Sequence, residues 1–417
     1  MGKISLKIRK STLMIVIIII LMHNFFYLAP NRIGPLSYAD VLFIFSIGVE
    51  FYYLTKDRSL FFKGKFKQIV WMVPILIILS SVAAWFNYGQ PIISGILTQR
   101  YWLSTIFIYF IFVHMIDVGA LDYNLFIKIL NSIVIIELVL YFFQFFIGES
   151  FMFLNINYNY RYGTIRLYCN TNYMVLAALI ALYEVCTEKK GRVFKLGLVV
   201  AVILYFLLVN KGRSATMGLM LGLAVVVLFC PVKMRYKMLF GGIAAIIGLN
   251  CLWSTTLIQD FWNVVFKGQE DGTYNVRLRS QRFYIQKWFS SPVSLLLGYG
   301  YGNSTIWASM VATGASQGFG YADNGLYGFV SCYGVVGLIW YFAFCSKRAV
   351  AWWKTRDGKG IIVLASLVMM LAQFKTIVSF FYVYHSFEMV MVMVMIELVC
   401  RQVDSSRNQS VRSLEYV

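Results

Sequence analysis

Long apolar segments alternate with short polar ones along the chain, and this pattern limits the fold more than any other feature. Runs such as residues 13–21, 69–82 and 194–209 lie in windows long enough to cross about 30 Å of hydrocarbon. Only 13% of the residues are charged, whereas soluble domains carry roughly a quarter. Because hydrocarbon offers no partner for a backbone N–H or C=O group, such segments fold as helices. The sequence therefore predicts an all-α, polytopic integral membrane protein.

The apolar segments predict about twelve transmembrane helices in a single membrane domain over residues 1–417. They lie near residues 11–29, 36–54, 68–87, 101–117, 124–147, 171–187, 194–209, 214–230, 236–253, 323–345, 360–375 and 379–400. With the N-terminus inside, every strongly basic short loop falls on the inner side, as the positive-inside rule requires. That side holds 25 of the 37 Lys and Arg residues, and the outer side holds 12. Both termini are therefore expected in the cytoplasm, with residues 401–417 as a polar tail.

The net charge of +19 would also suit a protein that binds nucleic acid. In a membrane chain, however, basic inner loops set the orientation and touch anionic lipid. We therefore expect membrane lipid, and no nucleic acid, as the partner of this charge. The cysteines show no CxxC spacing and the three histidines are scattered, so no metal site is predicted.

One loop is long, and it falls on the outer side at residues 254–322. Part of this loop, residues 277–289, carries apolar and basic residues at helical spacing. Its two faces are Tyr284, Ile285, Trp288 and Phe289 on one side, and Arg279, Arg282 and Gln286 on the other. This pattern predicts a short amphipathic helix with its apolar side toward lipid or the bundle and its basic side toward water or a ligand. A flexible, turn-forming run, residues 298–302, follows it.

Several basic residues lie on the outer side, where membrane insertion does not require them. They form three groups: Arg161 with Arg166, Lys211 with Arg213, and Arg277, Arg279 and Arg282 with Lys287. Arginine side chains match phosphate oxygens with paired hydrogen bonds. The groups therefore predict a pocket for an anionic, phosphate-bearing substrate. The alternatives are that Arg213 snorkels to lipid phosphate and that the 277–289 helix rests on anionic headgroups.

Two short motifs add detail to this outer site. Gly212 permits close backbone approach, and Ser214 can cap a helix whose N-terminus favours anions. Asp323 and Asn324 open the tenth predicted span. Asp323 is a candidate base, a partner for an arginine, or a helix cap, since Asp is a favoured cap residue.

Ionisable residues also occur inside the predicted spans, where proton relays and transport paths use such groups. They are Glu50, Glu137, Glu184, Glu388, Glu397, His114 and His385. Most fall near span ends or in the cytoplasmic half. His385 is expected in the outer third of the last span, either lining the outer cavity or packing with a hydrogen bond.

The chain resembles the O-antigen polymerases of the Wzy type and the related O-antigen ligases. The resemblance covers about a dozen helices and one large late periplasmic loop. It rests on three patterns: Arg161–Ile165 through Cys169–Asn172; Lys211–Ala215; and Arg277–Trp288, Pro292, Gly298 and Gly300 followed by Asp323–Asn324 and Tyr333–Gly337.

The resemblance implies a metal-independent glycosyltransferase of the bacterial inner membrane that needs no cofactor. It would polymerise undecaprenyl-pyrophosphate-linked repeat units at the periplasmic face for O-antigen or a related surface polysaccharide, with such lipids as donor and acceptor. A chain-length regulator and a flippase are the partner proteins it suggests. The implied catalytic residues are Arg213, Arg279 and Asp323, and the implied substrate-binding residues are Arg161, Arg166, Lys211, Arg277, Arg282 and Asn324.

Two departures from the family pattern matter. Ligases are expected to carry His before the late Asn, but this chain has Asp323, which favours a polymerase over a ligase that transfers glycan to lipid A core. Three arginines stand where one is expected, and we favour Arg279 because it shares a face with Arg282. A lipid-linked oligosaccharide flippase is the alternative from another class, although transporters typically show two related halves.

Overall fold

In the computed structural model most of the chain is helical. The structure describes residues 10–30, 32–161, 164–169, 172–231, 273–356, 358–373 and 383–414, with positions 233, 234, 237, 241, 242 and 246. The helices before the long loop are α1 (Lys10–Met22), η1 (Asn24–Tyr27), α2 (Tyr38–Lys56), η2 (Leu60–Phe62), α3 (Lys67–Tyr88), α4 (Ile92–Thr98), α5 (Arg100–Asp117), α6 (Tyr123–Ile147), α7 (Asn172–Thr187), α8 (Arg192–Leu204), η3 (Tyr205–Asn210) and α9 (Arg213–Phe229).

The later part of the chain, as far as the structure describes it, adds four longer helices and four short helices of three to six residues. The helices are α12 (Thr273–Trp288), α13 (Pro292–Leu297), α14 (Trp307–Ala312), η4 (Ala315–Gln317), η5 (Ala322–Asn324), α15 (Gly325–Thr355), α16 (Gly360–Ala372) and α17 (Val383–Leu414). Two small antiparallel hairpins complete the described fold. They consist of β1 (Arg32–Ile33) with β2 (Leu36–Ser37), and β3 (Tyr158–Arg161) with β4 (Thr164–Leu167).

Among the described residues, five helices are long and apolar enough to cross a membrane, and the number is six if α4 and α5 count as one span bent by 56°. The five are α2, α3, α6, the helix formed by α8 with η3, and the helix that contains α15. Four shorter apolar helices lie in α1, α7, α9 and α16. These helices indicate a membrane protein. The predicted span at 236–253 lies mostly outside the described residues.

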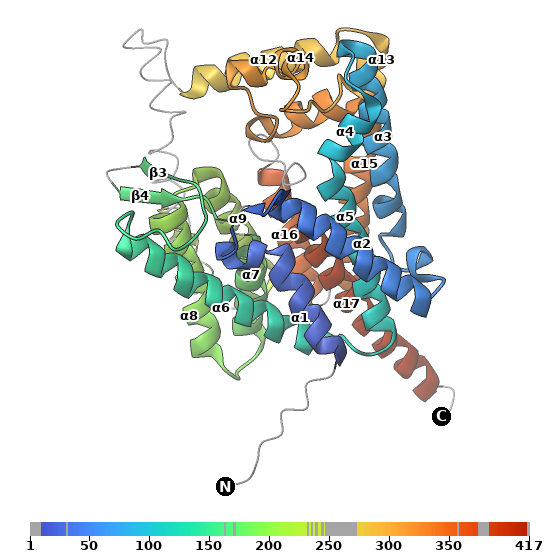
Figure 1. Ribbon diagram of the computed structural model, residues 1–417. Coiled ribbons are helices and arrows are strands. Elements are labelled where there is room, and N and C mark those ends of the chain that lie inside the picture. The colour runs from blue at the N-terminus through green and yellow to red at the C-terminus, as the bar shows by residue number, and fades with distance from the viewer. Residues whose placement is uncertain are drawn as a thin grey trace.

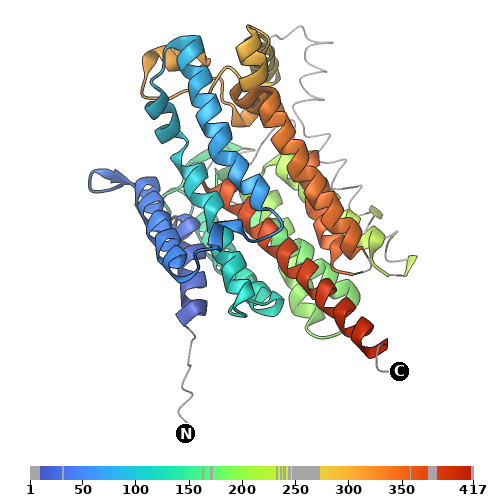
Figure 2. The same ribbon diagram turned by 90° about the vertical axis from the view of Figure 1, so that its right-hand side faces the viewer.

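The long helices run roughly side by side between two ends of the molecule (Figures 1 and 2). We call one end the cap, which consists of α12, α13, α14 and the segments that join them up to residue 322. The start of α1 and the end of α17 lie at the opposite end, which we call the terminal end. Because α3 and α15 reach the cap, they position it relative to the other helices.

Three helices form the centre of the bundle. Residues 386–400 of α17 and 173–183 of α7 are buried on every side, and so is most of α5. A helix that is apolar all round is typical of such a central position. Within this core, α17 packs on α5, α7 packs on α8 and α9, and α16 packs on α9 and α15.

Several elements differ in extent from the predicted segments. The predicted span at 323–345 continues as α15 to Thr355, and α17 continues as helix into the predicted tail, to Leu414. The predicted span at 194–209 ends in a π-helix, η3, and α15 is interrupted at Gly334, where φ is 61°. Helix α3 ends at Gly89, which adopts the left-handed conformation typical of a helix C-terminus.

Candidate functional site

The predicted amphipathic helix is present as α12, and its arginines form one exposed face. Arg277, Arg279 and Arg282 are exposed, whereas Ser280 and Tyr284 on the other side are 2% and 1% exposed. None of the three arginines pairs with a carboxylate among the described residues. Helix α12 therefore presents a row of guanidinium groups outward at the cap.

A buried hydrogen bond joins α12 to the start of α15. Asn324 donates through Nδ2 to Ser280 Oγ at 2.6 Å and to the carbonyl oxygen of Gly320 at 2.8 Å. Asn324 is only 1% exposed, so its side chain lies between the helices instead of facing outward. The neighbouring Asp323 is exposed. Asp323 precedes Asn324 in the chain, and Arg279 precedes Ser280. The hydrogen bond between Asn324 and Ser280 therefore brings the backbones of Asp323 and Arg279 to the same joint.

Tyrosine rings fill the space beneath α12. The ring of Tyr284 lies 5.2 Å from that of Tyr321, which stacks on Tyr301 at 5.3 Å. Lys287 lies 4.7 Å from the centre of the Tyr299 ring and donates to the Tyr299 hydroxyl at 3.3 Å. These rings therefore pack against one another and a lysine, while Trp307 of α14 is 71% exposed.

The glycine-rich run at 298–302 is not a free loop, although its composition predicts a flexible one. The Tyr299 amide donates to the carbonyl oxygen of Ser331 at 2.6 Å, where α15 is interrupted. Gly300, with φ 102°, approaches α3 so closely that a Cβ atom there would lie 2.5 Å from the backbone nitrogen of Ala84. Only glycine tolerates both this φ value and this contact.

Polar side chains at the end of α3 hold the rest of the cap. Gln90 donates to the carbonyl oxygen of Tyr301 at 3.0 Å, and its Oε1 accepts from the amide of Asn303 and the hydroxyl of Ser309. The side-chain amide of Asn87 also bonds to the cap: it donates to the carbonyl oxygen of Tyr299 and accepts from the hydroxyl of Ser294. The cap is therefore fastened to α3, α4 and α15, and α12 is mounted on a fixed base.

The first two basic groups meet at the β3–β4 hairpin. Arg166 donates to the carbonyl oxygen of Asn210 at 2.7 Å, and Lys211 donates to that of Ile165 at 3.0 Å. Lys211 also contacts Thr164 and has a positive φ of 51°. These bonds tie the hairpin to the turn that joins η3 and α9, so both cations are engaged by the protein backbone.

The remaining predicted residues are placed by their backbone. Arg161 ends β3, opposite Thr164, and Arg213 is the first residue of α9. Their side chains lie outside the described part of the structure, as does that of His385. Figure 1 shows α12 along the cap and the hairpin at the side of the molecule, so the first two basic groups share one region and the α12 row occupies another.

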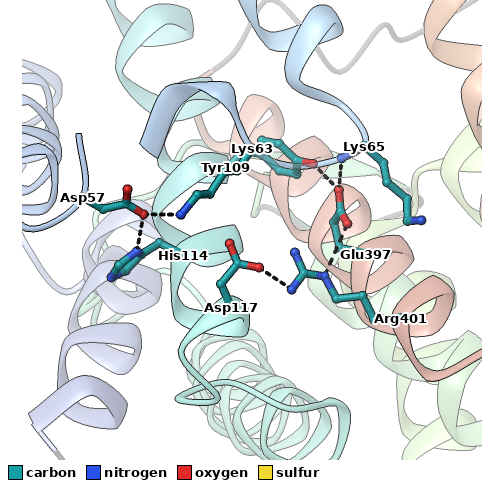
Figure 3. Close-up of polar contacts among 8 residues, drawn as sticks. All are labelled: Asp57, Lys63, Lys65, Tyr109, His114, Asp117, Glu397 and Arg401. Atoms are coloured by element: carbon teal, nitrogen blue, oxygen red, sulfur yellow. Dashed lines mark hydrogen bonds and ion pairs between the residues drawn. The ribbon is translucent and has the colours of Figure 1, made fainter. Parts of the chain in front are cut away.

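The structure also shows a polar cluster at the terminal end, which Figure 3 displays. The carboxylate of Asp57 accepts from Lys63 at 2.6 Å and lies 3.0 Å from Nδ1 of His114. Hydrogen bonds from Lys63 and then Ser59 hold the pKa of Asp57 well below its usual range. This arrangement fastens the segment between α2 and α3 to α5.

A second part of the same cluster surrounds Glu397 of α17. Its carboxylate accepts from the amide of Lys65 and the hydroxyl of Tyr109, and Arg401 lies 3.8 Å away (Figure 3). Arg401 also pairs with Asp117 at 2.5 Å. Glu397 is 1% exposed and serves to join α17, α5 and the segment before α3. This pattern is typical of a structural clamp.

Sequence patterns did not indicate these contacts. Glu397 and His114 stood out only as ionisable residues in apolar segments, and nothing in the sequence paired either with its partner. Gln90 carried no signal at all, since a single glutamine after an apolar run is ordinary. Among the described residues, no group of three or more His, Cys, Asp or Glu side chains is arranged to hold a metal ion.

No protein-family model matches the sequence, and no curated protein matches it significantly.

Proposed function

We propose that this protein is a glycosyltransferase that polymerises undecaprenyl-pyrophosphate-linked oligosaccharide units at the periplasmic face of a bacterial inner membrane. The product would be O-antigen or a related surface polysaccharide. The observation that carries the proposal is the exposed arginine row of α12, mounted on a fixed base at one end of apolar helices.

The chemistry needs positive charge where the leaving group forms. When the glycosidic bond to the lipid breaks, negative charge develops on the pyrophosphate, and donors already in position stabilise it. Arg279 and Arg282 suit this role because their guanidinium groups are exposed and bind phosphate oxygens in pairs. Arg213, at the first turn of α9, would meet the same lipid from the hairpin side.

The acceptor hydroxyl must lose a proton as the new bond forms, and Asp323 is our candidate base. It is exposed and adjoins Asn324, whose bond to Ser280 brings it to the joint with α12. Asn324 itself would act by holding that joint, since it is buried.

The proposal includes twelve spans with both termini in the cytoplasm. The position of the first turn of α1 and the last turns of α17 at the end opposite the cap supports it (Figure 1). In this orientation the cap faces the periplasm, and the start of α1 and the end of α17 face the cytoplasm.

The test is a polymerisation assay with purified protein and a lipid-linked repeat unit. We expect Arg279→Ala and Arg213→Ala to abolish long products, while Lys128→Ala, an exposed cation on α6, retains them. Normal long products from both arginine variants, at normal expression, would overturn the proposal. In cells, loss of a polymerase leaves surface lipid with a single repeat unit, whereas loss of a ligase leaves none.

A lipid-linked oligosaccharide flippase is the second candidate, and one observation favours it. Glu137 and His23 form a fully buried ion pair in the apolar bundle, and transporters use such intramembrane groups. Proteoliposomes with a lipid-linked oligosaccharide in one leaflet separate the two candidates. A flippase moves the lipid across without joining units, whereas a polymerase lengthens the glycan in place.

A further inference from the structure

An imidazole and a carboxylate meet deep in the bundle, away from the candidate site. His23 follows α1, and its Nε2 lies 2.5 Å from Oε1 of Glu137 in α6. Both side chains are completely buried. The hydroxyl of Tyr141, one turn further along α6, lies 3.2 Å from the same imidazole nitrogen.

The surroundings of this pair are aromatic and contain further titratable groups on each packed element. The centre of the Tyr173 ring in α7 lies 4.8 Å from that of the His23 ring, and the two rings pack edge to face. The other groups are Tyr27 of η1, Cys169 before α7, Tyr205 of η3 and Glu388 of α17. Glu388 in turn faces Arg348 of α15. At neutral pH the tyrosines and the thiol are uncharged, so His23 is the group that compensates Glu137.

Several polar atoms of this region have no hydrogen-bond partner among the described residues. They include His23 Nδ1, both carboxylate oxygens of Glu137 and the hydroxyl of Tyr173. Buried polar atoms without partners are rare in folded proteins, and they concentrate where a ligand, water or proton is handled.

Two backbone segments near the pair, residues 24–27 and η3, have unusual conformations. Residues 24–27, directly after His23, all have positive φ values between 48° and 62°, and none of them is glycine. This conformation costs roughly 1–2 kcal/mol per residue for L-amino acids, so packing must hold it in place. Tyr205, near the pair, begins the π-helix η3, and π-helical turns are frequent at functional sites.

We propose that His23 and Glu137 form a buried proton-binding site. At 2.5 Å, a nitrogen lone pair and an oxygen lone pair repel each other unless a proton lies between them. A carboxylate facing a neutral imidazole would also leave one charge in a completely buried site, at a cost of several kcal/mol. The pair therefore holds one proton in the folded protein.

The position of the site gives this proton a consequence. Because the Glu137 side chain is completely buried, the proton can leave only after part of the packing around it opens to water. The same region carries η3, whose last residue, Asn210, accepts the bond from Arg166. Because the Tyr205 ring of η3 lies 5.8 Å from the ring of Tyr141, which contacts His23, we expect loss of the proton to affect η3 and the bond from Arg166 to Asn210.

Counting protons on unfolding tests the proposal without any assumption about catalysis. In an unfolded chain at about pH 8.5, neither a histidine nor a glutamate retains the proton, because their ordinary pKa values are about 6.5 and 4.3. The purified protein would be denatured in weak buffer with a pH-indicator dye. We expect the wild type to release one more proton per molecule than Glu137→Gln.

Two further variants separate proton binding from a structural role. In His23→Gln, Glu137 remains buried without a cation and must be protonated, so the released proton should remain. In Asp57→Asn, which removes the other carboxylate beside a histidine, release should equal that of the wild type because Lys63 already compensates Asp57. Equal release by wild type and Glu137→Gln, with both proteins folded beforehand, would overturn the proposal. Loss of the extra proton in Asp57→Asn would overturn the assignment to this pair.

Discussion

Asn324 and Ser280 are joined by a buried hydrogen bond of 2.6 Å that connects the exposed arginine helix to the start of α15. The Oδ1 atom of Asn324 has no partner among the described residues, so the amide acts through its two donated bonds. Because Ser280 follows Arg279 in the chain, this bond positions the backbone of the residue that we assign to phosphate binding.

We predict that Asn324→Ala weakens the joint between α12 and α15. The substitution leaves the Ser280 hydroxyl and the Gly320 carbonyl without their donor, at a cost of about 1–3 kcal/mol. A lower thermal unfolding midpoint in detergent would show it. Asp323→Ala is the control, because that exposed neighbour should change stability by less than about 0.5 kcal/mol. Equal destabilisation by both variants would contradict the role of the bond.

Gly334→Ala should prevent the cap from seating on α15. Gly334 has a φ of 61°, and a Cβ atom there would overlap the backbone of Leu296 and Gly298. We expect a large loss of monodisperse protein in size-exclusion chromatography. Gly197→Ala is a matched control, since that helical glycine of α8 has open space around it and alanine should stabilise it by about 0.5–1 kcal/mol. A well-folded Gly334→Ala protein would show that the close approach is dispensable.

Arg279→Lys should retain charge but lose paired hydrogen bonding to phosphate. If Arg279 meets the pyrophosphate, we expect kcat/KM for polymerisation to fall roughly tenfold, equal to about 1.4 kcal/mol of transition-state stabilisation. Arg277→Lys is the comparison, because a residue that contributes only to the local field tolerates this change. Similar rates for both variants would remove Arg279 from the phosphate site.

The terminal end should lose stability in acid through Asp57. Its pKa is depressed in the folded protein, chiefly by the hydrogen bond from Lys63. A depressed carboxylate contributes stability above its unfolded value of about 3.9, and this contribution is lost as the pH falls below that value. Between about pH 6 and pH 3, the unfolding midpoint of the wild type should therefore fall more than that of Asp57→Asn. Parallel curves would mean that Lys63 and Ser59 do not stabilise the ionised form.

The helical part of the candidate site was predictable because its signal is local. The spacing of Tyr284 against Arg279 and Arg282 predicts two faces of one helix, and in α12 Tyr284 is buried while the two arginines are exposed. The buried position of Asn324 was not predictable, because an asparagine beside an aspartate at the start of a helix is equally typical of a ligand-binding residue and of a residue that joins two helices. The run at 298–302 was misjudged for the same reason: glycine indicates freedom in isolation, but here it permits contact with α3 and α15.

Residue patterns alone predicted that the chain forms apolar helices and that one late helix is amphipathic, and the structure has both. These properties depend on residues within a few turns of one another. The tertiary structure alone decided that Asn324 holds Ser280, that Gln90 holds the cap and that His23 meets Glu137. Each of these contacts joins segments far apart in the chain. The apolar pattern determines which helix faces are buried. The packing of whole helices determines which buried polar atoms come close enough to form hydrogen bonds with one another.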